Sequence, residues 1–152
     1  MALLTTDEIT QRLQSMPTFR GLAPEALKAI AEKAEVQYAS QGDHLYKIGQ
    51  LADQMYIVES GRVILQEPTH LNTLRDAGRA GPGSVIGLEA AAKNQPYTQT
   101  TLVAEPTTMF ALNSQAIGEL LTVYPFLRRR LNKYQRQQRR LNRLNLPSRL
   151  DD

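Results

Sequence analysis

The sequence of 152 residues contains no cysteine and no tryptophan, and aromatic residues make up only 6% of it. Without cysteine the chain cannot form disulfides, zinc–thiolate sites or cysteine-ligated iron–sulfur clusters, and it cannot use a thiol nucleophile. No apolar run approaches the roughly 18 residues that a membrane-spanning helix needs. The first residues, Met1 to Thr5, also lack the basic and apolar regions of a secretory signal, so we expect a cytoplasmic protein.

What the sequence does contain is typical of a globular protein, with one unusual distribution of charge. Hydrophobic residues make up 41% and charged residues 22%, and a chain of this length predicts a single domain, residues 1–152. From Leu120 to the end there are 8 Arg, 1 Lys and 2 Asp, a net charge of +7, whereas the first 119 residues carry −4. This asymmetry indicates an anionic partner for the C-terminal segment.

The pattern of apolar residues divides the chain into helical ends and a β-rich middle. Residues 1–35 are predicted to form two helices, of which the second begins at Pro24 and buries a face that includes Leu27 and Ile30. Between residues 36 and 112, short apolar runs alternate with glycine-containing turns about every 8–12 residues, which is typical of a β-sandwich or barrel. The expected strands include 44–48, 55–58, 63–65, 100–104 and 107–112.

Helix is predicted to return over residues 113–146, followed by a tail at 147–152. Ser114 is expected to cap a short helix, and a long helix follows from about Phe126 until Pro147 stops it. In the long helix five residues repeat at steps of four and three, as the a and d positions of a coiled coil do: Leu127, Leu131, Tyr134, Gln138 and Leu141. We favour a homodimer seam over the alternative, an amphipathic helix that lies on its own β-domain.

The rest of the long helix is strongly basic. Its cations are Arg128, Arg129, Arg130, Lys133, Arg136, Arg139, Arg140 and Arg143. The simplest interpretation is a solubilising face, and the alternatives are an acidic protein partner, nucleic acid or an anionic membrane surface. The apolar side lacks the Trp or Phe expected of a membrane-surface helix, which argues against the last alternative.

A glycine-bracketed loop lies between the predicted strands. It runs from Gly83 to Gly87, continues as Leu88-Glu89, and is followed by a polar segment, Gln95–Thr101. Glycine allows a tight turn or a close approach of the backbone to a ligand, and such loops can hold a phosphate on backbone N–H groups. From these residues alone, a tight turn without a ligand is the favoured interpretation.

The order of the elements and several motifs resemble the cyclic-nucleotide-binding domain family, the effector domain of the catabolite activator protein and of the fumarate–nitrate regulators. The resemblance covers about residues 19–143. It rests on Tyr56–Val63 with its Ser60-Gly61 pair, on Gly42-Asp43 and Gly49-Gln50, and on Gly83–Gly87 as the entry to a phosphate-binding cassette. It implies a mainly β fold: a double-stranded β-helix (jelly-roll) barrel with N-terminal helices, a short helix and a long C-terminal helix.

The cassette departs from the family pattern at the positions that bind nucleotide. Members that bind cyclic nucleotides place Glu directly after the second glycine, for the ribose, and Arg about ten residues later, for the phosphate. Here Leu88 follows Gly87, Glu89 comes one place late, and Thr98-Gln99 stand at the Arg position. We therefore expect no ordinary cAMP binding. The candidate ligand contacts are Gly87, Leu88, Glu89, Thr98, Gln99, Thr100, Tyr134 and Gln138.

Two further comparisons with the family limit the function. The cassette is closer to that of the fumarate–nitrate type, whose iron–sulfur cluster needs cysteines that this chain lacks. DNA-binding members continue into a helix-turn-helix domain, whereas only Asn145 to Asp152 follow here, so we expect no operator binding by that route. The two histidines, His44 and His70, lack metal-ligand spacing, and we expect neither a metal site nor catalytic residues.

The sequence therefore predicts a dimeric, non-enzymatic sensor or regulatory domain. No cofactor is certain, and a small nucleotide-like effector is expected if any ligand binds. One alternative is a true cyclic mono- or dinucleotide receptor, in which arginines of the long helix replace the cassette Arg. The other is a nucleic-acid-binding accessory protein that acts through the basic helix.

Overall fold

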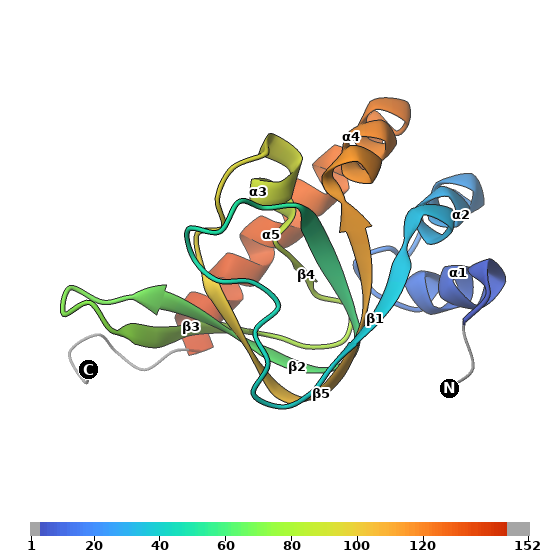
Figure 1. Cartoon of the computed structure of the whole chain (residues 1–152). Helices are drawn as coiled ribbons and strands as arrows, with labels where there is room; N and C mark the ends of the chain where they lie inside the picture. Colours follow the sequence, from blue (N-terminus) through green and yellow to red (C-terminus); the bar gives the residue numbers. More distant parts are fainter. Residues whose placement is uncertain (1–3, 146–152) are drawn as a thin grey trace.

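The computed structural model describes residues 4–145, with side chains as far as Asn142 (Figure 1). The expected helix stop at Pro147, the tail 147–152 and the side chain of Arg143 lie outside the described residues. Within residues 4–145, five helices flank one antiparallel sheet of five strands. The helices are α1 (Thr6–Gln14), α2 (Pro24–Lys33), α3 (Leu88–Lys93), α4 (Ser114–Val123) and α5 (Pro125–Asn145). The strands are β1 (Glu35–Ala39), β2 (Gln54–Pro68), β3 (Leu74–Ala80), β4 (Val85–Ile86) and β5 (Thr100–Asn113).

The sheet confirms the predicted fold class, although its hydrogen-bonded ladder does not close into a barrel. The strand order is β1-β5-β2-β3, with β4 paired to β2 beside this path, so β1 and β3 are its two ends. The long strands β2 and β5 bend strongly, and the β2–β3 hairpin extends away from the N-terminal helices (Figure 1). Helix α5 crosses the molecule from α4 toward this hairpin, which places it over one opening of the curved sheet.

The expected separation of strands 55–58 and 63–65 is wrong, and so is that of 100–104 and 107–112, because β2 and β5 are each continuous. β2 runs through Ser60-Gly61, where its register with β5 shifts repeatedly between Val58 and Val63. Gly61 has φ +98°, and a Cβ there would lie 2.4 Å from Thr107 Oγ1, so the backbones of the two strands meet at a position that only glycine can fill. The Ser60-Gly61 pair therefore marks a bulge within one strand rather than a turn between two strands.

The expected strand at 44–48 is also wrong, although this segment does run along β5. Thr101 N–H donates to the Tyr46 carbonyl at 3.0 Å, while Thr101 Oγ1 accepts from the N–H of Leu45 at 2.8 Å and of Tyr46 at 3.0 Å. Thr100 Oγ1 accepts from Ile48 N–H at 3.0 Å. Because threonine hydroxyls take the place of carbonyl acceptors, the segment is attached to β5 without a regular ladder.

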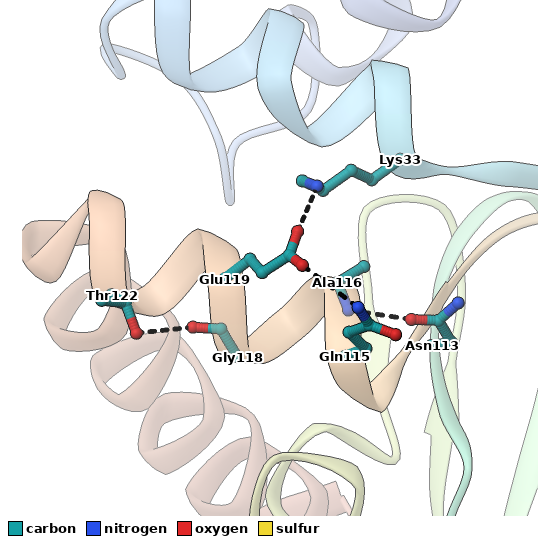
Figure 2. A network of polar contacts seen from close by, with 7 residues as sticks. All are labelled: Lys33, Asn113, Gln115, Ala116, Gly118, Glu119 and Thr122. Carbon is teal, nitrogen blue, oxygen red and sulfur yellow. Dashed lines mark hydrogen bonds and ion pairs between the residues drawn. The ribbon is translucent and has the colours of Figure 1, made fainter.

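Helix α4 has a capped N-terminus and is joined to α2 by an ion pair, as Figure 2 shows. Its N-cap is Asn113 rather than Ser114, since Asn113 Oδ1 accepts from Ala116 N–H at 2.8 Å. Lys33 of α2 donates to Glu119 of α4 and holds the pKa of that carboxyl below its usual value. These contacts fix the base from which α5 departs.

The core is a single hydrophobic cluster to which every helix contributes. Leu127 and Leu131 of α5 lie in it with only 2% and 4% of their surface exposed, and Tyr134 packs against it. Leu141 is 48% exposed. The leucine face of α5 therefore packs on its own domain, as the alternative interpretation of the repeat expects, and the homodimer stays a prediction.

Candidate functional site

A cavity of about 930 Å³ lies between the glycine-bracketed loop, the β2–β3 hairpin and α5. Its wall contains the start of α3 and the polar segment that precedes β5, together with one side of α5. The lining residues are Tyr46, Leu65, Glu67, Arg75, Asp76, Ala77, Val85, Ile86, Gly87, Leu88, Glu89, Ala90, Tyr97, Thr98, Gln99, Gln135, Gln138, Arg139 and Asn142. A cavity of this volume is large enough for a ligand the size of a nucleotide.

Six of the eight candidate ligand contacts line this cavity: Gly87, Leu88, Glu89, Thr98, Gln99 and Gln138. The other two are placed elsewhere. Thr100 is buried, and its hydroxyl is used to hold Ile48. Tyr134 packs against the core and is absent from the lining.

A stack of tyrosines forms part of the wall. The rings of Tyr46 and Tyr97 are parallel with centroids 3.8 Å apart, and the ring of Tyr56 follows at 6.3 Å from that of Tyr46. Tyr97 donates its hydroxyl to the Gln54 carbonyl at 2.5 Å, and Gln54 Nε2 donates to the Tyr56 hydroxyl at 2.8 Å. Tyr46 is 4% exposed and lines the cavity, and within residues 4–142 its hydroxyl makes no hydrogen bond.

The phenols of this stack are held in their neutral form. Burial raises the pKa of Tyr46 and of Tyr97, and it raises the pKa of Tyr56 to about 12. The neighbouring phenols add to the shift at Tyr46. This part of the wall therefore offers aromatic surface and neutral hydroxyls rather than charge.

Gly87 is covered by two of these rings. It has φ +77°, and a Cβ there would lie 3.2 Å from Tyr97 Cε1 and 3.4 Å from Tyr46 Cε2. A side chain at this position would therefore require both a strained backbone and displacement of the stack. The close approach that this glycine permits is to the protein's own tyrosines.

Glu89 points toward α5 and is already paired there. Its Oε2 lies 2.7 Å from Arg139 Nη2, and its Oε1 lies 3.4 Å from Lys93 Nζ. The side chains of Glu89 and Arg139 are 54% and 59% exposed, so this contact contributes little to folding stability. Its position is informative nevertheless, because it joins the start of α3 to the helix that covers the cavity.

The charged lining includes three acids and two cations. The acids are Glu67, Asp76 and Glu89, and the cations are Arg75 of β3 and Arg139 of α5. Gln99 Nε2 donates to Glu67 Oε1 at 2.9 Å, which orients one of the acids. No cation in the lining comes from the cassette segment itself.

Sequence reasoning missed several residues of this wall. Tyr46 and Tyr97 are 51 residues apart in the numbering and meet only because the irregular 44–48 segment runs beside the start of β5. Arg75 lies between the predicted strands 63–65 and 100–104, in a segment without an apolar pattern or a motif that would single it out. Gln135 and Asn142 could have been found, because they lie three residues before and four residues after Gln138 on the same side of a helix.

The cations of α5 separate into distinct groups. Arg130 donates to the carbonyls of Thr18 and Arg20, at 3.4 Å and 2.8 Å. Arg139 belongs to the cavity wall. Five others are exposed and make no contact with a polar partner in the part of the chain that the structure describes: Arg128, Arg129, Lys133, Arg136 and Arg140.

The histidines and acids offer no assembled metal site among residues 4–142, where no three His, Cys, Asp or Glu side chains gather. His44 Nδ1 donates to the Thr101 carbonyl at 2.6 Å and so helps to attach the 44–48 segment to β5. No helix in the described range is both long and apolar enough to cross a membrane.

A sequence model of the cyclic nucleotide-binding domain matches residues 36–124, more than half of the chain. The chain therefore belongs to the cyclic nucleotide-binding domain family. A cAMP-dependent protein kinase regulatory subunit from Debaryomyces hansenii is 30% identical over 124 residues, which are 80% of this chain and 26% of that protein. The chain thus spans about a quarter of the length of the two cAMP-dependent protein kinase regulatory subunits that it matches.

Solved structures support the same fold. The catabolite activator protein of Thermus thermophilus matches with a TM-score of 0.73 and 24% identity, over 84% of this chain and 60% of that one. The regulatory subunit of a cAMP-independent protein kinase A from Trypanosoma brucei matches with a TM-score of 0.69 and 17% identity, over 87% of this chain and 51% of that one. That subunit is bound to cAMP as a triple mutant, in which one threonine is changed to arginine.

Proposed function

We propose that this chain is a non-catalytic regulatory domain that binds a small effector in the cavity beneath α5 and does not hold cAMP in the usual way. The observation that carries the proposal is the charge of the wall. Glu67, Asp76 and Glu89 outnumber Arg75 and Arg139, and both arginines belong to elements outside the cassette.

A cyclic nucleotide brings a negatively charged phosphate that needs a charge-assisted partner. Thr98, at the position where the family resemblance expects arginine, supplies a hydroxyl instead. Arg139 is paired through Nη2 with Glu89, which offsets part of its charge where an anion would bind. Losing a charge-assisted contact typically costs about 1.5–3 kcal/mol, or roughly ten- to hundredfold in affinity. The tyrosine stack and the amides of Gln99 and Gln138 suit a ligand with an aromatic or hydroxylated surface.

The test is the melting temperature of the purified chain with cAMP, cGMP and cyclic di-GMP, each at high concentration. A ligand at about a hundred times its Kd adds roughly 2.7 kcal/mol, a shift of several degrees. We expect no shift with cAMP. A Thr98→Arg variant, which supplies the missing cation, should gain a cAMP-dependent shift, and Thr98→Gln is its uncharged control. A clear shift of the unaltered chain with cAMP would contradict the proposal.

A second candidate is a cyclic dinucleotide receptor, because two arginines do line the cavity. Arg139 would then exchange Glu89 for a ligand phosphate. Arg136, one turn away on α5, is absent from the lining and provides a matched control. If cyclic di-GMP stabilises the chain, Arg139→Ala should remove the shift and Arg136→Ala should leave it. Equal effects of the two variants would exclude this binding mode.

We also propose that the chain forms a homodimer, independently of the effector. Leu127 and Leu131 are buried within one chain, so a dimer through α5 would need another part of the helix, such as the exposed Leu141. Size-exclusion chromatography with light scattering measures the mass directly. A monomer at the highest attainable concentration would remove the homodimer from the proposal.

A further inference from the structure

Four of the exposed cations of α5 form one continuous stripe. Arg129, Lys133, Arg136 and Arg140 follow one another at steps of four, three and four residues. Because successive helical residues are rotated by about 100°, the four lie within about 60° of the helix circumference and span about 16 Å along its axis. We call these four residues the basic stripe.

The basic stripe faces away from the domain. Leu127 and Leu131, which are buried in the core, lie on the side of the helix roughly 170° from the centre of the stripe. All four stripe residues are exposed, and none makes a hydrogen bond or ion pair with the described part of the chain. There is no acidic residue anywhere in α5 to neutralise them. The stripe is therefore an unscreened line of positive charge.

We propose that the basic stripe binds the phosphate backbone of nucleic acid, without reading its sequence. Guanidinium groups pair well with phosphate oxygens, and protein–nucleic acid interfaces are much more positively charged than protein–protein interfaces. This surface does not depend on the cavity, and the inference stands apart from the proposed effector.

The composition of the stripe favours nucleic acid over the other anionic partners. A protein interface normally has an apolar or aromatic centre, and a membrane-surface helix has an apolar face beside its cations. Among the α5 residues up to Asn142, the large exposed apolar ones are Phe126, one turn before Arg129 at the end of the stripe, and Leu141, which lies roughly 110° from its centre. No exposed apolar side chain lies between the four cations of the stripe.

The inference is tested by fluorescence anisotropy of labelled 30-base-pair DNA and RNA duplexes of arbitrary sequence, titrated with the full chain between 50 and 200 mM salt. Four phosphate contacts predict a slope of log K against log salt of about −3.6, which is roughly a hundredfold loss of affinity across this range. Arg136→Gln should make the slope less steep by about 1. Replacement of all four stripe residues by Gln should abolish binding at 100 mM salt.

Arg128→Gln is the matched control, because it removes the same charge from the same helix about 100° away from Arg129. Its effect should be smaller than twofold. Thermal melting of each variant checks that the fold is retained. Unchanged binding by the fourfold variant, or a flat salt response, would overturn the inference. Preference for poly-glutamate over both duplexes would do so too and would assign the stripe to an acidic protein partner.

Discussion

The tyrosine stack of the cavity wall packs closely only while its phenols are neutral. It consists of Tyr46, Tyr56 and Tyr97. The rings of Tyr46 and Tyr97 fill the space over Gly87, and the hydroxyls of Tyr56 and Tyr97 bond to amide and carbonyl groups of Gln54 rather than to a cation. Burial raises all three pKa values, that of Tyr56 to about 12. Ionisation of any of them would place a charge in a stack that has no positive partner to receive it.

This arrangement predicts a loss of stability in alkaline solution. In the unfolded chain a tyrosine ionises at a pKa of about 10, whereas the folded chain keeps these phenols protonated to higher pH. The unfolded state therefore releases protons first, and the free energy of unfolding should be constant below about pH 10 and fall as the pH rises toward 12. Urea unfolding at pH 8, 9, 10 and 11 measures this fall.

The comparison is with Tyr46→Phe, which keeps the ring and removes one of the three buried phenols. Because the Tyr46 hydroxyl has no hydrogen-bond partner among residues 4–142, the variant should be about as stable as the unaltered chain at pH 7. Above pH 10 it should lose stability less steeply. Identical pH dependence of the two proteins would show that the stack is not the titrating group.

At the scale of elements, the position of α5 over the cavity depends on a contact with β3. Gly78 lies directly beneath Asn142, and a Cβ at this glycine would lie 2.6 Å from Asn142 Nδ2 and 2.9 Å from its Cγ. The same Asn142 accepts from Arg79 N–H at 3.5 Å. A second polar contact of this half of α5 joins Arg139 to Glu89, and both side chains are exposed.

Gly78→Ala should therefore loosen the second half of α5 with little effect on the rest of the domain. We expect hydrogen exchange of residues 135–142 to become roughly fivefold faster, which corresponds to about 1 kcal/mol in local opening. Gly81→Ala is the control, since nothing lies within 4 Å of a Cβ at that position. Asn142→Ala alone should speed exchange of the same residues, and adding Gly78→Ala to it should have little further effect, because the side chain that the new methyl would meet is gone. Unchanged exchange in Asn142→Ala would argue that this contact does not hold the helix.

The elements also show where sequence periodicity was sufficient and where it was not. Helices α1, α2, α4 and α5 follow from capping residues, prolines and apolar spacing, all of which are local. β2 and β5 are longer than predicted because Gly61 pairs tightly with Thr107, a contact between distant residues. The 44–48 segment looked like a strand because its residues are apolar and aromatic. The hydroxyls of Thr100 and Thr101 accept its N–H groups and prevent a regular ladder with β5. This contact between distant residues cannot be predicted from the local sequence pattern.

The cavity was predictable only in part for the same reason. Gly87, Glu89 and Thr98 were identified through their place in a family motif, and they do line the cavity. The tyrosines and Arg75 come together through the folding of the sheet. The leucine repeat of α5 gave the correct apolar face, but a repeat cannot distinguish a partner helix from the chain's own core.

At the scale of the whole molecule, the leucine face of α5 stabilises either the fold of one chain or a dimer, and substitutions can distinguish the two. Leu131 is 4% exposed and belongs to the single core cluster, whereas Leu141 is 48% exposed. Leu131→Ala should lower the free energy of unfolding by about 2–5 kcal/mol, the usual cost of truncating a buried leucine. Leu141→Ala, the same change on the same helix, should cost no more than about 0.5 kcal/mol.

The dependence of these effects on protein concentration separates folding from association. If α5 packs within one chain, unfolding is unimolecular. Each protein, the unaltered chain and Leu131→Ala, should then have the same urea midpoint at 1 μM as at 100 μM chain, although the midpoint of Leu131→Ala is lower. If Leu131 instead stabilises a dimer, the midpoint of the unaltered protein should rise with concentration, since an obligate dimer has no stability apart from its protomer concentration. In that case Leu141→Ala should also weaken the dimer. A concentration-independent loss confined to Leu131→Ala would assign the leucine face of α5 to the core and leave the basic stripe as the face of the helix available to a partner.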